Sequence, residues 1–136
     1  MSVFDEKESK KVVLADLNFS SNRMSELTRY IGFGSLALVF TVLTSNSTFA
    51  QSIMSESKLQ LLAIGALGAI TIFIDYLHYF SSYMQSRLVL NNTESFSYDD
   101  IPILKGVRTG LFWLKQLIAI ISVMLVFYLI VHQAVK

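Results

Sequence analysis

Residues 59–83 read LQLLAIGALGAITIFIDYLHYFSSY, and this stretch decides the fold class because it is long, apolar and carries a single formal charge, at Asp75. A helix needs about 20 apolar residues to cross about 30 Å of hydrocarbon. Residues 30–55 carry no charge, and residues 111–135 carry only Lys115. We therefore expect an all-α integral membrane protein with three transmembrane helices, at about residues 24–44, 59–83 and 111–134.

The composition of the whole chain agrees with this interpretation. Of its 136 residues, 53% are apolar and 15% are charged, and the net charge is +1. Soluble domains usually carry about 25% charged residues. The length accommodates one domain, which we divide into a cytoplasmic N-terminal arm (1–23) and a three-span transmembrane bundle (24–134). The lack of cysteine excludes a disulfide-stapled domain, a thiol enzyme and a cysteine-ligated metal centre.

The lysines and arginines outside the apolar cores predict the orientation of the chain. Cytoplasmic segments of membrane proteins are enriched in these residues. The first loop has only Lys58 and the C-terminal end only Lys136, whereas the N-terminal segment and the second loop are basic. We therefore expect an N-in/C-out protein with a cytoplasmic loop between helices 2 and 3. The residues that carry this prediction are Lys7, Lys10, Lys11, Arg23, Arg29, Arg87, Lys105 and Arg108.

Two segments near the predicted helix starts carry local signals. Ser57 and Gln60 have the spacing of a capping box at the start of the second span. The N-terminal arm has a mixed charge cluster followed by the apolar run 12–14. It is interpreted either as a flexible arm that touches the lipid headgroups or as a strand or helix that docks on a partner or a neighbouring copy.

A short cytoplasmic helix is expected before the third span. Asp99 or Asp100 would cap it, and Pro102 would lie in its first turn, where the missing amide does no harm. Gly106 and Gly110 would loosen its join to the membrane helix, because glycine is a poor helix former.

Aromatic and basic residues gather where the predicted spans meet the cytoplasmic surface. Tyrosine and tryptophan favour the headgroup level, and arginine favours the same region on the cytoplasmic side. The membrane-interface anchors predicted in this way are Arg29, Tyr76, Tyr79, Tyr83, Arg87, Arg108 and Trp113.

The second and third spans also carry polar residues at helical spacing. Charged side chains in hydrocarbon cost about 2.5–3.5 kcal/mol each on insertion scales, so they normally face protein or water. Small residues beside them let another helix approach closely. The predicted intramembrane polar stripe is Thr71, Asp75, His78, Ser82, Lys115 and Ser122, and the predicted packing residues are Gly65, Gly68, Ala69 and Ala119.

The depth of the two charges predicts that they meet. Asp75 lies seven residues from Ser82, and Lys115 lies seven residues from Arg108, which places each about 10 Å inside the bilayer at 1.5 Å per residue. Because the second and third spans run antiparallel, we expect an Asp75–Lys115 ion pair, within one chain or between subunits. His78 would lie one turn nearer the cytoplasm.

No motif in the sequence supports an enzyme. The chain has no Gly-rich phosphate loop, no nucleophile elbow and no H-E-x-x-H metal motif, so no catalytic residue, metal site or cofactor is expected. The near-neutral charge gives no support for nucleic-acid binding. Three helices alone enclose no water-filled path, so a transport role would require further copies.

Two functions therefore remain open. The first is a small polytopic inner-membrane protein that acts without catalysis as an oligomeric or partner-bound helical bundle: an accessory, immunity or anchoring subunit with helices 2 and 3 docked by the Asp75–Lys115 pair. The second is a homo-oligomeric conductor of ions or protons, such as a membrane-depolarising defence protein, with the helix-2 stripe lining the path. The expected partners are the lipid bilayer and either further copies of the chain or another membrane subunit.

Overall fold

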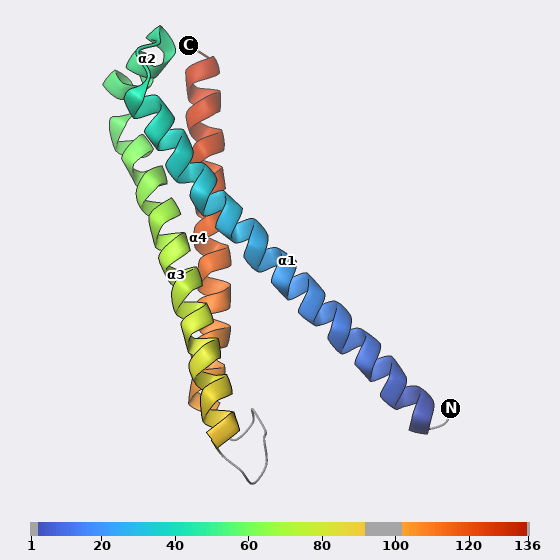
Figure 1. Cartoon of the computed structure of the whole chain (residues 1–136). Coiled ribbons are helices and arrows are strands. Elements are labelled where there is room, and N and C mark those ends of the chain that lie inside the picture. The colour runs from blue at the N-terminus through green and yellow to red at the C-terminus, as the bar shows by residue number, and fades with distance from the viewer. Residues whose placement is uncertain (1–2, 92–101, 136) are drawn as a thin grey trace.

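The computed structural model describes residues 3–91 and 102–135, with side chains from residue 11 onward. Its described part is all-helical, with α1 (Val3–Thr44), α2 (Thr48–Glu56), α3 (Lys58–Asn91) and α4 (Pro102–Ala134) (Figure 1). Three of these helices, α1, α3 and α4, are long and apolar enough to cross a membrane. The prediction of an all-α chain with three candidate spans is thus confirmed.

The long helices form an antiparallel hairpin with a third helix laid across it. In Figure 1, α3 and α4 lie side by side along their length, while α1 packs on them with its C-terminal half and diverges toward its N-terminal end. Residues 11–20 of α1 are all exposed. The molecule therefore has a packed end, which holds α2, and an open end where α1 has separated from the hairpin.

Glycines set the crossing of α1 over α3. A Cβ atom added to Gly68 would lie 2.8 Å from the Gly32 carbonyl oxygen and 2.9 Å from the Ser35 Cβ. Membrane helices associate through such close packing of small residues. Gly65 is likewise buried, against Val39 of α1. Ala69, by contrast, is exposed, so the expected packing of Ala69 on another helix is not met within this chain.

The apolar core lies at the packed end of the molecule. Its buried members come from all four helices and are Val39, Ile53, Leu61, Ile64 and Leu129. The short helix α2 closes this end, in the loop between the first two predicted spans, where the sequence predicts no helix. Its N-terminus is capped by Ser47, whose Oγ accepts a hydrogen bond from the Ala50 amide at 3.2 Å.

The capping box expected from Ser57 and Gln60 is not formed. Ser57 lies between α2 and α3, and its amide donates to the Ile53 carbonyl at 2.8 Å. In a capping box this amide would donate to the Gln60 side chain, so it is not free for that bond. Within the described chain, Gln60 Oε1 has no hydrogen-bond partner. The Ser57 hydroxyl instead lies 3.4 Å from Gln133 Nε2 and so links this turn to α4.

The helix boundaries differ from the predicted ones at the open end. The N-terminal arm is helical from Val3 and continues without a break into the helix of the first predicted span. Similarly, α4 runs unbroken from Pro102 through Gly106 and Gly110, so these glycines do not interrupt the helix. Asp99 and Asp100, expected as caps, lie outside the described residues.

Candidate functional site

Asp75 and Lys115 form an ion pair between α3 and α4, as the sequence predicts. Lys115 Nζ lies 2.6 Å from Asp75 Oδ1. Lys115 is 0% exposed and Asp75 is 4% exposed. The pair lies within one chain, so neither charge needs a second subunit to compensate it.

The first helix supplies two further members of the site, which the sequence interpretation missed. Arg29 Nε lies 2.9 Å from Asp75 Oδ2, and Ser25 Oγ donates to Asp75 Oδ1 at 3.1 Å. Lys115 Nζ also donates to Ser25 Oγ. These four residues, Ser25, Arg29, Asp75 and Lys115, are called the charge cluster below. Because it takes members from α1, α3 and α4, it joins all three long helices at one point.

Aromatic rings surround the two cations of the charge cluster. The Arg29 guanidinium lies 5.2 Å from the centre of the Tyr79 ring. Lys115 Nζ lies 5.7 Å from the Tyr79 ring and 5.6 Å from the Phe112 ring. Cation–π attraction stabilises such charges by about 0.5–2 kcal/mol, depending on desolvation. The rings therefore compensate part of the positive charge that one carboxylate cannot balance.

His78 lies next to the charge cluster on the side of the open end. Its Nδ1 is 3.5 Å from Lys115 Nζ, and the ring is half-buried against Phe112, with ring centroids 6.0 Å apart. It contacts the cluster through the lysine. This places His78 at the boundary between the buried charges and the space where α1 diverges.

The remaining residues of the predicted stripe do not join the charge cluster. Thr71 is fully buried and donates to the Leu67 carbonyl of its own helix at 2.8 Å. Ser82 is half-buried and donates to the His78 carbonyl at 3.0 Å. Both hydroxyls therefore bond to backbone carbonyls of α3 itself and not to Asp75.

A further polar contact joins α1 to α4 nearer the packed end. Ser35 Oγ and Ser122 Oγ lie 2.9 Å apart, and Ser122 is fully buried. Ala119, also buried, lies one turn away on the same helix. The stripe on α4 therefore meets α1 as well as α3.

We expect this serine pair to contribute little to stability. Interhelical hydrogen bonds in membranes average about 0.6 kcal/mol, so a cycle of Ser35→Ala, Ser122→Ala and the double variant should give a coupling near that value. Reversible unfolding by SDS in mild-detergent micelles, followed by the fluorescence of Trp113, measures it. A coupling above about 2 kcal/mol would show that this contact is a second fixing point for α1.

The predicted interface anchors divide into two groups. Arg29 contacts Asp75 through its guanidinium, and 40% of its side chain is exposed. The others are exposed in the described chain, which is compatible with contact to lipid headgroups; they are Tyr76, Tyr79, Tyr83, Arg87, Arg108 and Trp113.

The contribution of α1 has a signal in the sequence that could have revealed it. Buried small or polar residues recur at spacings of three and four along this helix, at Ser25, Thr28, Gly32 and Ser35. Thr28 Oγ1 lies 2.8 Å from Gln116 Oε1 of α4. This spacing defines one helix face, and Arg29 lies beside that face. The sequence analysis used Arg29 only to predict the orientation and the membrane interface, so its contact with Asp75 was not considered.

Comparison of the chain with protein-family models, with curated proteins and with solved structures finds no match. The residues that the structure describes also bring together no group of three histidine, aspartate or glutamate side chains that could hold a metal ion. Function is therefore inferred from the charge cluster and its surroundings. The charge cluster joins three helices, and its single carboxylate, Asp75, is paired with both Lys115 and Arg29.

Proposed function

We propose that the chain is a non-catalytic membrane protein that works by assembling with further copies or with another membrane subunit. The observation that carries this proposal is the charge cluster, in which Asp75 is shared between Lys115 and Arg29 of the same chain. A carboxylate engaged in this way fixes helix positions. It is not left to bind a substrate or relay a proton.

The N-terminal half of α1 supports an assembling role. Val12 and Phe19 lie seven residues apart, hence on one helix face, and both are exposed. Under the N-in orientation this segment lies near the cytoplasmic surface of the membrane, because Leu17 lines the same cavity as Arg108. Apolar patches exposed to water mark interaction sites. An accessory, immunity or anchoring subunit of a bacterial inner membrane fits these features.

The alternative is a homo-oligomeric conductor whose helix-2 stripe lines a path for ions or protons. It requires Thr71 and Asp75 to face water, yet both are buried among helices of their own chain. Conduction would therefore need the hairpin and α1 to separate first. The burial of these two residues favours the assembling role.

Assembly is tested on the full chain extracted directly from cell membranes into lipid nanodiscs, with the particle mass measured. We expect a particle mass greater than that of one chain in its nanodisc. The double variant Val12→Ser with Phe19→Ser should lower this mass by at least the mass of one chain or of one partner protein. Leu90→Ser is the matched control, because Leu90 is an exposed apolar residue on α3 that lies outside this segment.

Two outcomes would contradict the proposal. The first is a wild-type particle that holds one chain and no co-extracted protein. The second is ion flux in proteoliposomes that is lost in a folded Asp75→Asn variant, which would favour the conducting alternative. Flux that is absent in the wild type, together with an assembly that depends on α1, supports the assembling role.

A further inference from the structure

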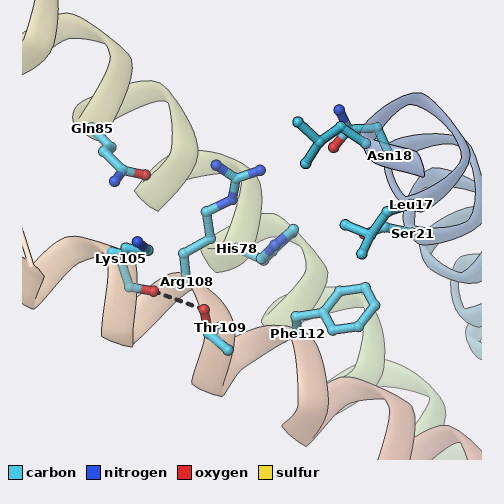
Figure 2. A pocket seen from close by; sticks show the side chains of 10 residues that line it. Leu17, Asn18, Ser21, His78, Gln85, Lys105, Arg108, Thr109 and Phe112 are labelled. Atoms are coloured by element: carbon cyan, nitrogen blue, oxygen red, sulfur yellow. Dashed lines mark hydrogen bonds between the residues drawn. The ribbon is translucent and has the colours of Figure 1, made fainter. Parts of the chain in front are cut away.

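A cavity of about 540 Å³ opens where α1 diverges from α3 and α4. Figure 2 shows Arg108 and Lys105 of α4, Gln85 and His78 of α3, and Asn18 of α1 around this space. Ligand cavities in proteins usually measure about 300–1,000 Å³. The cavity is therefore large enough for a small polar group, and it adjoins the charge cluster through His78.

The wall of the cavity is positively charged. Arg108 and Lys105 line it, and none of the lining residues that the structure describes is an aspartate or a glutamate. Among the described residues, no ion pair or hydrogen bond engages the Arg108 guanidinium. The nearby charge cluster adds two cations against one carboxylate. Guanidinium groups bind phosphate through paired, charge-assisted hydrogen bonds, so this wall favours an organic phosphate.

Gln85 gives the cavity a second feature that calls for a ligand. Its side chain lines the space yet is only 1% exposed, and its Oε1 has no partner among the described residues. A buried acceptor left unpaired is unfavourable by about 1–3 kcal/mol. An amide oxygen accepts hydrogen bonds, so the missing partner is a donor. A phosphate diester has none, but a hydroxyl group beside the phosphate would supply one.

An adjoining hollow shows where an apolar tail could lie. This second hollow measures about 490 Å³ and shares Leu17, Ser21 and Phe112 with the cavity. Met24 and Trp113 extend its lining, and both are exposed apolar residues. Asp16 and Ser20 complete it. The polar cavity thus continues into a mostly apolar one, which is the shape of a site for an amphiphile.

We propose that this cavity binds an organic phosphate that carries a hydroxyl group, supplied by an anionic glycerolipid of the surrounding leaflet. Arg108 would hold the phosphate, and Gln85 would accept a hydrogen bond from the headgroup hydroxyl. The acyl chains would leave along Leu17, Phe112 and Trp113. A lipid bound there would fill the space between α1 and the hairpin and hold the open end together.

The test measures lipid binding to the purified full chain in an uncharged detergent by native mass spectrometry. The probes are phosphatidylglycerol, which has phosphate and hydroxyl groups, phosphatidic acid, which lacks the headgroup alcohol, and phosphatidylcholine, which is zwitterionic. We expect phosphatidylglycerol to bind best. Arg108→Gln should weaken it about tenfold, and Gln85→Met should narrow the preference for phosphatidylglycerol over phosphatidic acid to less than about twofold.

Arg87→Gln is the matched control, because Arg87 is an exposed arginine of α3 that does not line the cavity. It should change binding less than twofold, and circular dichroism checks that each variant keeps its helices. Equal losses in Arg87→Gln and Arg108→Gln would overturn the site, since they would indicate general surface charge. Free sn-glycerol 3-phosphate is the last probe. If it raises the melting temperature of the wild type but not of Arg108→Gln while the lipids have no effect, the lipid source is overturned.

Discussion

Replacing Asp75 with asparagine should lower the free energy of unfolding by about 3–5 kcal/mol, because removal of one partner leaves buried charges uncompensated. Lys115 is fully buried and would lose the one carboxylate that pairs with it among the described residues, while Arg29 would lose its contact across the α1–α3 interface. Unfolding by SDS in mild-detergent micelles measures the change. The matched control is Asp16→Asn, because Asp16 is an exposed aspartate of α1.

A loss below about 1 kcal/mol, equal to that of the Asp16 control, would contradict the fastening role of the charge cluster. A charge exchange sharpens the test. Asp75→Lys with Lys115→Asp restores the pair between α3 and α4, but it places a lysine beside Arg29. We therefore expect the exchange to remain destabilised, and the further change Arg29→Gln to recover stability by removing the like charge. Full recovery by the exchange alone would show that Arg29 contributes nothing.

Replacing Gly68 with alanine should lower the free energy of unfolding by about 1–3 kcal/mol, the usual effect of overpacking. The new Cβ would lie 2.8 Å from a backbone oxygen, that of Gly32, so relief requires α1 to move away from α3. Spin labels on α1 and α3 should report a longer distance between the helices. Gly34→Ala is the control, because a Cβ at Gly34 meets nothing within 4 Å.

The Gly34 variant should unfold as the wild type does, or slightly later, because alanine is the better helix former. If both glycine variants behaved alike, the α1–α3 crossing would not depend on close backbone approach. If Gly68→Ala kept its stability but its spin-label distance rose, the crossing would be adjustable and the charge cluster alone would hold α1.

The sequence was sufficient to predict the three long helices and the contact between Asp75 and Lys115. Both follow from general physical principles. An apolar run of bilayer length forms a helix. Opposite charges at equal depth in antiparallel helices pair with each other, because lipid tails provide no partner for a charge. The predicted ends of the first and third spans, at residues 44 and 134, also match the structure, in which α1 ends at Thr44 and α4 ends at Ala134.

The role of α1 in the site could not be predicted from the same reasoning. Arg29 lies near a predicted membrane boundary, where an arginine is equally expected to contact lipid headgroups. Its contact with Asp75 depends on how α1 is rotated about its own axis, which the sequence pattern does not give. The helix α2 was missed because its nine residues are too few to span a membrane, which left only the capping position of Ser47 as a signal. The cavity depends on the angle between α1 and the hairpin, which hydropathy does not encode.

The unbroken length of α1 has a mechanical consequence. With 42 residues it measures about 63 Å, and it is anchored by Arg29, Gly32 and Ser35 while its first turns stand clear of the hairpin (Figure 1). A helix of this length can pivot about the point where α1 crosses α3, at Gly32 and Gly68. A push applied to its N-terminal end would tilt the arm and pull Arg29 against Asp75, so a force on that end would strain the buried charges.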